Sequence, residues 1–278
     1  RISTIKPLVL EKIILILFVV IFVFSGYQLF RETQQYQQAE NEYESLEATY
    51  VQKEITQADS PENANVVTAV EESPYPKLNI DFAALQTLNP DVVGWLYVEG
   101  VEISYPIVQT VDNDYYLNHT VEKQVNSSGA IFMDYENAAD FYDYNTFLYG
   151  HNMKNNTMFG ALKRYYKEDG VCEQNPYFYI YLPTGEVLKY QIFSYYLTTD
   201  TSDSYVLVST QEEYDAYVDK VYRRSAFAGN TVTQQYSTMV TLSTCAGASS
   251  GNQRFLVHGF CVDEFVNGFF TNSEKLCR

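Results

Sequence analysis

The sequence predicts a mainly β protein, a barrel or sandwich of about eight strands with inserted helices, preceded by an apolar helix and a helical stalk. Three observations lead to this class. An unbroken apolar run occupies residues 13–24, and a stretch with helical spacing follows it. From residue 94 onward, short β-branched or aromatic segments alternate with turn residues. The sequence shows no internal repeat.

The N-terminal apolar segment is long enough to span a bilayer. Together with its apolar flanks at 8–10 and 26–30, it reaches the ~20 residues that a bilayer needs. Basic residues lie on its amino side, and mostly acidic or neutral residues follow it, so the positive-inside rule predicts a cytoplasmic N-terminus and an extracellular remainder. The alternative is a cleaved signal peptide, but no small-x-small cleavage site follows Phe24. We therefore assign residues 1–30 to a cytoplasmic stub and a single transmembrane anchor.

Residues 31–77 are predicted to form a helical stalk and a linker. Tyr36, Tyr43, Leu46 and Tyr50 recur at helical spacing and indicate an amphipathic helix that extends to about Gln57. The stretch 59–76 is acidic and contains prolines, which is typical of a linker. The folded domain is then expected to span residues 78–278.

The elements of this domain follow from local patterns. Helical spacing predicts helices at Asn79–Asn89, Asn113–Asn118, Met158–Tyr166 and Gln211–Ser225. The turn Pro183-Thr-Gly-Glu186 predicts a hairpin between the fifth and sixth strands. The predicted strands are Gly94–Val98, Ile103–Val108, Gly129–Asp134, Asn145–Gly150, Tyr177–Leu182, Val187–Tyr196, Met239–Cys245 and Arg254–Val262.

Composition excludes some classes of function. The formal net charge is −17, and no Lys/Arg cluster lies in the folded part, which argues against nucleic acid as a partner. No group of carboxylates resembles a calcium site, so no metal or other cofactor is expected. Four cysteines are too few for a disulfide scaffold and show no metal-type spacing: Cys172, Cys245, Cys261 and Cys277.

The stretch Thr241-Leu-Ser-Thr-Cys245 is the leading candidate for chemistry. It ends a buried strand, a small flexible loop follows it, and Arg254 opens the next strand. The guanidinium of Arg254 keeps its proton, so it offers fixed positive charge to a thiolate or to a developing oxyanion. The alternative is a buried structural cysteine beside a surface arginine.

A nucleophilic cysteine needs a group that removes its proton, and histidine is the usual one. His119 lies on a polar turn and is expected to be a solvated loop residue, whereas His258 alternates within the last strand and is expected on a barrel face. His151 instead follows a strand at its carboxyl end, where a side chain projects from a rigid scaffold into a groove. His151 is therefore the candidate base.

These residues together resemble a known family. Leu148-Tyr-Gly-His-Asn-Met153, Thr241-Leu-Ser-Thr-Cys245 and Arg254, in this order, resemble the class B sortases, and the agreement runs from about Leu78 to Val262. Asp112-Asn-Asp-Tyr-Tyr-Leu117 and the long helix before the seventh strand agree as well. The resemblance implies an eight-stranded sortase-type β-barrel, a membrane anchor with the catalytic domain outside, and transpeptidation of sorting signals in a Gram-positive cell envelope.

Carried over to this sequence, the resemblance assigns roles. Cys245 would attack the scissile Thr carbonyl, His151 would protonate the leaving amine and later deprotonate the incoming one, and Arg254 would bind the substrate backbone and stabilise the oxyanion. Structural alternatives are Leu117 as core, Asn113 as a helix cap and Ser243 as a strand residue facing the barrel. The implied walls of the substrate groove are Asn113, Leu117, Tyr205 and Val206 in the segment Thr201–Val206, Ser243 and Thr244.

The predicted function is a membrane-anchored cysteine transpeptidase. It would cleave an Asn-Pro-x-Thr-like sorting signal of surface proteins after Thr and pass the acyl group to an amine of a peptidoglycan precursor. An alternative uses a pilin lysine as the acceptor. The absence of a second apolar span after Val262 and of an Asp-Pro-aromatic motif ahead of the barrel argues against that class C pattern. A third alternative is a non-catalytic, membrane-tethered binding module.

Overall fold

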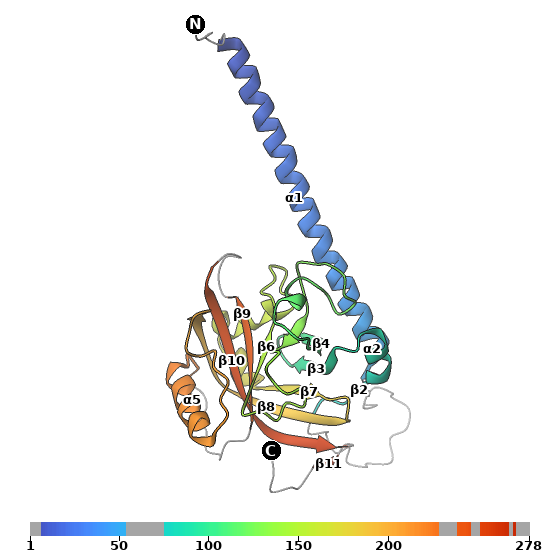
Figure 1. Ribbon diagram of the computed structural model, residues 1–278, viewed down its shortest axis with the longest axis vertical. Coiled ribbons are helices and arrows are strands. Elements are labelled where there is room, and N and C mark those ends of the chain that lie inside the picture. Colours follow the sequence, from blue (N-terminus) through green and yellow to red (C-terminus); the bar gives the residue numbers. More distant parts are fainter. Residues whose placement is uncertain (1–6, 54–74, 228–237, 246–250, 267–268, 271–278) are drawn as a thin grey trace, which may run out of the picture.

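The computed structural model describes residues 7–53, 75–227, 238–245, 251–266 and 269–270. Most of the predicted linker, the loop at 246–250 and Cys277 lie outside the described residues. A long helix leaves one side of a β-barrel, and shorter helices lie on the outside of the barrel (Figure 1).

The predicted membrane segment and stalk form one continuous helix, α1 (Pro7–Tyr50). Residues 27–50 contain neither Gly nor Pro, so nothing in the sequence interrupts the helix at this junction. Among the described residues, α1 is the one helix that is long and apolar enough to cross a membrane, by length and composition. The predicted amphipathic face is confirmed, because Tyr43 and Leu46 are buried in the core of the barrel domain, but the helix ends at Tyr50 and not at about Gln57.

A two-stranded ribbon, not predicted from the sequence, connects the end of α1 to the barrel. Strand β1 (Val51–Lys53) pairs antiparallel with β2 (Leu78–Ile80). Helix α2 (Phe82–Leu88) follows β2, and the carboxylate of its N-cap, Asp81, accepts a hydrogen bond from the main-chain N of Ala84 over 2.9 Å. This cap satisfies one of the donors that a helix leaves free at its start.

Eight strands close into the barrel, as predicted. Around the barrel they follow the order β10-β8-β7-β3-β4-β5-β6-β9, β9 pairs back onto β10, and β11 extends the sheet beyond β10. The β4–β5 and β6–β9 pairs are parallel, and the other pairs are antiparallel. The strands are β3 (Val92–Val98), β4 (Ile103–Val108), β5 (Ile131–Met133), β6 (Asn145–Tyr149), β7 (Tyr177–Tyr181), β8 (Glu186–Thr199), β9 (Met239–Cys245), β10 (Gln253–Val266) and β11 (Phe269–Phe270).

Strands β4 and β9 have the predicted bounds, whereas β8 and β10 are longer than predicted. Each has 14 residues, because the two strands pair with each other along their whole length. A register shift lies between His258 and Gly259. A Cβ at Gly259 would lie 2.4 Å from the ring of Phe178, so β10 needs a glycine where it crosses β7 and β8.

The inserted helices are shorter than predicted, except one. The predicted helix at Asn113–Asn118 is the 3-10 turn η1 (Tyr115–Leu117), and the one at Met158–Tyr166 divides into η2 (Phe159–Lys163) and α3 (Arg164–Lys167). A further short helix is α4 (Val171–Gln174). Helix α5 (Gln211–Arg224) matches its prediction, because a capping box of Thr210 and Glu213 fixes its start.

The core lies in two clusters. The larger fills the barrel around Trp95 and reaches the second half of α1, and the smaller lies between the sheet and α5. The apolar face of α5 consists of Tyr214, Tyr217, Val218 and Val221, all buried. Burial of such side chains stabilises a fold by roughly 1.5–3 kcal/mol each. Helix α5 is thereby held against β8, next to the segment that leads from β8 into it.

Candidate active site

The carboxyl ends of β6 and β9 meet at one end of the barrel. These strands pair in parallel, with Tyr149 opposite Ser243. His151 follows β6, and Cys245 is the last residue of β9. Across the β9–β10 pair, Cys245 is the register partner of Arg254. The topology therefore brings the three predicted catalytic positions to the same end of the barrel.

A groove of about 390 Å³ opens at this end. Its surface is mostly apolar and aromatic with a few polar groups, which is typical of sites that bind organic ligands or short peptides. Most of the predicted site residues contribute to it. The lining residues are Asn113, Leu117, Phe132, Tyr149, Gly150, His151, Asp200, Tyr205, Ser243, Thr244 and Arg254.

The imidazole of His151 is oriented by main chain. Its Nε2 lies 2.6 Å from the carbonyl oxygen of Leu117. A carbonyl oxygen only accepts hydrogen bonds, so Nε2 carries the hydrogen, and Nδ1 is the nitrogen that holds the lone pair when the ring is neutral. The backbone beside the ring is also fixed, since Gly150 N donates to Ser243 O over 3.2 Å and Phe159 N donates to His151 O over 3.0 Å.

Arg254 lies on the wall of the groove near the end of β9. Its guanidinium donates to a carboxylate oxygen of Asp200 over 3.3 Å, and to the main-chain oxygens of Gly251 and Gln253 over 3.1 and 3.0 Å. The side chain is 23% exposed, so it is held in place but still open to the groove. The Arg254 guanidinium has five N–H donors, and the contact with Asp200 does not occupy all of them. Arg254 can therefore donate to another acceptor in the groove.

Tyr205 covers one side of the groove. Its hydroxyl and that of Ser243 are 2.7 Å apart, which ties the segment after β8 to the end of β9. Its ring stacks on those of Phe147 and Tyr149 at centroid distances of 5.8 and 6.5 Å. Three aromatic rings thus form a continuous surface that extends from beneath the groove into its wall.

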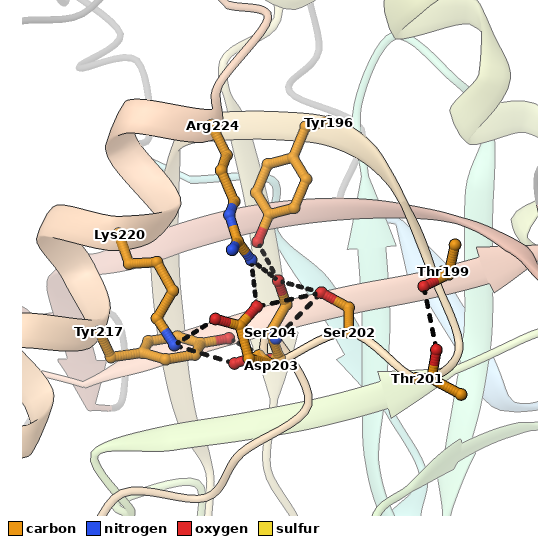
Figure 2. Close-up of polar contacts among 9 residues, drawn as sticks. All are labelled: Tyr196, Thr199, Thr201, Ser202, Asp203, Ser204, Tyr217, Lys220 and Arg224. Atoms are coloured by element: carbon orange, nitrogen blue, oxygen red, sulfur yellow. Dashed lines mark hydrogen bonds and ion pairs between the residues drawn. The ribbon is translucent and has the colours of Figure 1, made fainter.

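The residue before Tyr205 is held to α5 by a polar network that is buried at Ser204, Tyr196 and Tyr217 and exposed at Asp203 (Figure 2). The Ser204 hydroxyl accepts from Arg224 over 2.9 Å and from the Tyr196 hydroxyl over 2.9 Å, and the Ser204 carbonyl accepts from the Tyr217 hydroxyl over 2.7 Å. Arg224 also forms a 2.6 Å ion pair with Asp203. We call this set of five side chains the Ser204 network.

The residues after Tyr205 are held from the other side. Asn145, the buried first residue of β6, donates to Val206 O over 2.6 Å and accepts from Val208 N over 3.0 Å. Tyr205 is therefore fixed between two anchors: Ser204, which is hydrogen-bonded to side chains of α5, and Asn145 on the strand that leads to His151. Such double anchoring restricts the conformations of an exposed segment.

Asn113 is not the helix cap that the sequence also allowed. The N-cap residue of η1 is Asp114, and the carboxylate of Asp112 accepts from the main-chain N of Asp114 and Tyr115 over 2.8 Å each. The amide of Asn113 instead donates to Asp134 over 3.0 Å and accepts from Tyr135 N over 3.0 Å. Its orientation is thereby fixed, with the second N–H of Nδ2 left for another acceptor.

Asp134 also holds Tyr149 in the groove. The Tyr149 hydroxyl donates to the same carboxylate oxygen over 2.8 Å. Burial first, and then the charge of Asp134, raises the pKa of Tyr149 well above the ordinary tyrosine range. Tyr149 therefore stays a neutral hydrogen-bond donor at neutral pH.

The remaining predicted wall residues have different outcomes. Leu117 is 41% exposed on the groove, so the alternative that placed it in the core is wrong. Thr244 and Ser243 are nearly buried but line the groove, and the Thr244 hydroxyl has no hydrogen-bond partner among the described residues. Val206 does not line it. Its carbonyl turns toward Asn145, and its side chain is 45% exposed beside the groove.

Sequence reasoning missed Phe132, Tyr149, Gly150 and Asp200. Tyr149 carried a usable signal, because it lies two residues before His151, and residues two apart in a strand share a face. Asp200 carried none, since only the fold brings the end of β8 beside Arg254.

The other histidines and cysteines lie away from the groove, where they are described. His119 stacks on Tyr115, as suits a loop residue, and His258 is fully buried, where burial lowers its pKa to about 3. Burial raises the pKa of the free thiol of Cys172 to about 12, and Cys261 is disulfide-bonded. The described residues contain no group of three or more His, Cys, Asp or Glu arranged to hold a metal ion.

Comparison with known proteins agrees with this geometry. The family model of the sortase domain matches residues 96–262. Sortase B of Listeria monocytogenes is 32% identical over 228 residues, which cover 81% of this chain and 85% of the relative. Sortase B of Staphylococcus aureus is 29% identical over 247 residues, which cover 88% of this chain and 93% of the relative.

Solved structures give the same result. The structure of Clostridium perfringens sortase B matches with a TM-score of 0.60 and 34% identity, and the match covers 66% of this chain and 100% of that one. The structure of sortase B from B. anthracis matches with a TM-score of 0.63 and 28% identity, and the match covers 83% of this chain and 99% of that one.

The barrel and the sequence relatives thus define a cysteine transpeptidase. The chain belongs to the sortase family, and within that family to class B. Membership of this enzyme family excludes the alternative of a non-catalytic binding module.

Proposed function

We propose that this class B sortase is held in the cell membrane by α1, with its N-terminus in the cytoplasm and its barrel outside. There it cleaves an Asn-Pro-x-Thr-like sorting signal of surface proteins after Thr and transfers the acyl group to a cell-wall amine. The observation that carries the proposal is the groove beside the end of β9, which has both His151 and Arg254 on its wall. The apolar, exposed first half of α1 supports the anchor.

In the first half of the reaction, the Cys245 thiolate attacks the carbonyl carbon of the scissile Thr. The tetrahedral intermediate collapses as the C–N bond breaks, and the His151 imidazolium gives its proton to the leaving amine. Because Nε2–H is engaged with Leu117, we assign this proton to Nδ1. The product is a thioester between Cys245 and the Thr carbonyl.

In the second half, an amine attacks the thioester carbonyl. His151, now neutral, takes a proton from the attacking amine, and the bond between the carbonyl carbon and sulfur breaks to restore the thiolate. The thiolate and the imidazolium are both regenerated, so the cycle balances without a metal or a redox cofactor.

Arg254 is assigned to the oxyanion of both tetrahedral intermediates and to the substrate backbone. A guanidinium keeps its charge throughout the cycle, and its planar set of donors binds a carbonyl oxygen and a neighbouring oxygen together. Asp200 and two main-chain oxygens hold it in orientation before substrate arrives, which reduces the reorganisation that the reaction requires.

The walls of the groove support a short motif with an apolar residue between polar ones. Leu117 and the ring of Tyr205 offer an apolar surface for a proline. The free N–H of Asn113 offers a hydrogen bond to a polar group of the motif.

A paired thiol experiment tests the catalytic assignment. Cys245→Ala should abolish cleavage of an Asn-Pro-x-Thr peptide library with the fold intact by circular dichroism, and a peptide vinyl sulfone should label the parent but not this variant. Cys172→Ala is the matched control and should retain cleavage, because the Cys172 thiol is buried with a raised pKa. Full cleavage by Cys245→Ala would refute the assignment.

The acceptor is tested in the same assay by adding amines. A peptidoglycan-type amine should accept the acyl group in preference to a lysine side chain in a pilin-derived peptide. The opposite preference would replace wall anchoring by pilus polymerisation and would leave the thiol chemistry unchanged.

A further inference from the structure

The two parts of α1 have different surroundings. Every residue from Glu11 to Phe30 is exposed, and the large apolar side chains there include Phe22, which is 79% exposed. From Glu32 onward the helix packs on the barrel, with Ala39, Tyr43 and Leu46 buried. The packed part of the helix therefore begins almost where the apolar part ends.

The first barrel contacts of α1 come from two loops. Lys154, in the loop after β6, forms a 3.1 Å ion pair with Glu32. Asn126 and Ser127, in the segment between η1 and β5, donate to the main-chain and side-chain oxygens of Gln35 over 2.9 Å each. The part-buried bond from Asn126 to Gln35 holds the loop before β5 against the helix, and the exposed Lys154–Glu32 pair places the loop after β6 at the same level.

The part of α1 that these loops contact lies at the boundary between the hydrocarbon core of a bilayer and its headgroups. At 1.5 Å per residue, Glu32 and Gln35 lie about 3 and about 8 Å beyond Phe30 along the helix axis. The headgroup layer on each side of the hydrocarbon core is roughly 5–8 Å thick. The loops that hold Lys154 and Ser127 therefore lie at the depth of lipid headgroups when the apolar part of α1 fills the core.

The same loops belong to the groove end of the barrel. Lys154 comes three residues after His151, and Asn126 donates from its main-chain N to the carbonyl of Asn118, the residue after Leu117. The end of β9 and the start of β10 point toward the side from which the first half of α1 leaves the barrel (Figure 1). Val125, beside Asn126, is 75% exposed on this face.

We propose that the groove end of the barrel rests on the layer of phospholipid headgroups around α1, with Val125 in that layer. The groove then opens at the membrane surface and favours peptides that are tethered to the same membrane over free ones. This inference rests on the proposed membrane anchoring, and it adds a contact between the barrel and lipid.

Tryptophan reporters in the full-length chain test the contact. The chain has a single Trp, Trp95, which is fully buried and gives a constant background. The protein is reconstituted in phosphatidylcholine vesicles with a nitroxide either on the headgroup or in the acyl chain. Fluorescence of Val125→Trp should be quenched strongly by the headgroup nitroxide. Thr184→Trp, in the exposed turn between β7 and β8 at the far end of the barrel, should match the parent.

A third reporter separates this inference from the anchoring itself. Phe24→Trp lies in the apolar part of α1 and should be quenched by the acyl-chain nitroxide. If Phe24→Trp is not quenched, the proposed anchor is wrong. If Phe24→Trp is quenched while Val125→Trp is quenched no more than Thr184→Trp, the anchor stands and the headgroup contact is refuted.

The consequence for substrate choice has its own test. A flexible insertion of six Gly and Ser residues between Phe30 and Arg31 uncouples the barrel from the bilayer without touching the groove. Turnover of a soluble sorting-signal peptide should be unchanged, and turnover of the same peptide attached to a lipid in the vesicle should fall several-fold. An equal effect on both peptides, or none on either, would contradict the proposed preference.

Discussion

Nε2 of His151 donates its hydrogen to the main-chain carbonyl of Leu117 over 2.6 Å, and the side chain of the same Leu117 lines the groove. One short turn, η1, therefore provides both a wall of the groove and the orientation of the acid–base group. A peptide that displaces Leu117 also moves the acceptor that fixes the tautomer of His151. The position of the peptide and the position of the proton are coupled through this turn.

Replacement of His151 by glutamine separates the orientation of this side chain from its acid–base chemistry. The side-chain amide of His151→Gln still donates to the Leu117 carbonyl but exchanges no proton. We expect kcat to fall by about 10²–10⁴-fold with KM little changed. His119→Gln is the control, since His119 lies outside the groove, and it should behave as the parent. Near-parental kcat for His151→Gln would remove His151 from the mechanism.

Arg254→Lys tests the planar donor set. A single ammonium does not reproduce the contacts to Asp200, Gly251 and a substrate oxygen at once, so most of the activity should be lost in peptide cleavage assays. The control is Arg223→Lys on α5, whose ion pair with Asp219 is exposed and serves no groove residue. Retention of parental rates by Arg254→Lys would show that charge alone is sufficient.

Tyr205→Phe removes the hydroxyl contact to Ser243 and keeps the stacked ring. A net hydrogen bond of about 0.5–1.5 kcal/mol corresponds to about a 2- to 12-fold change, which we expect as a rise in KM for the peptide. Tyr222→Phe on the exposed side of α5 should leave KM unchanged. A fall in kcat without a change in KM would mean that Tyr205 acts on the chemical step and not on the peptide.

Arg224→Met breaks the Ser204 network at its ion pair with Asp203 (Figure 2). Loss of this anchor should loosen Tyr205, so KM should rise, while the rate at which a small alkylating agent modifies Cys245 should stay the same. Arg223→Met, one residue earlier, is the matched control. Equal loss in peptide turnover and in alkylation would indicate general unfolding and would contradict the positioning role.

His258 gives a pH dependence of stability. Its pKa is about 3 in the folded barrel because burial disfavours the charged ring, whereas an unfolded histidine has a pKa of about 6.5. Between these values the unfolded state binds more protons, so the free energy of unfolding falls as the pH is lowered from about 6.5 toward 3. The slope from this group is about 1.4 kcal/mol per pH unit.

Urea unfolding of the parent and of His258→Gln at pH 7 and pH 4.5 measures this contribution. Acidic groups contribute equally in both proteins, so the difference between the two slopes isolates His258. The variant should lose less stability than the parent on acidification. Identical losses would show that His258 does not remain neutral in the folded state.

The strands were largely predictable from the sequence because each is short, β-branched and bounded by turn residues. The lengths of β8 and β10 were not predictable from the sequence. Their extra residues are in strands because the two strands pair with each other, and no local pattern indicates this pairing. The 3-10 geometry of η2 was missed for a similar reason. Gly160, within η2, lies against the backbone of Met153, and this tertiary contact has no counterpart in the local helical spacing.

The site was predictable where chemistry restricts the residue type. Cysteine, histidine and arginine at strand ends carry their own signal, and His151 and Arg254 do line one groove. Asp134 and Asn145 gave no such signal, because an acidic residue or an amide at the end of a predicted strand is usually solvated. Their importance comes from burial and from the hydrogen bonds they make to Asn113, Tyr149 and Val206.

The parallel pairing of β6 with β9 has a consequence for how the enzyme matures. Residues 150–238 separate the two strands, and they include the whole β7–β8 hairpin and α5. Pairs so distant in sequence form late in folding, because long loops must close first. The pairing that brings the histidine strand beside the cysteine strand is therefore among the most distant in the barrel. A chain in which β6 and β9 have not paired has Cys245 without His151 nearby, so the predicted catalytic pair exists only once the barrel is closed.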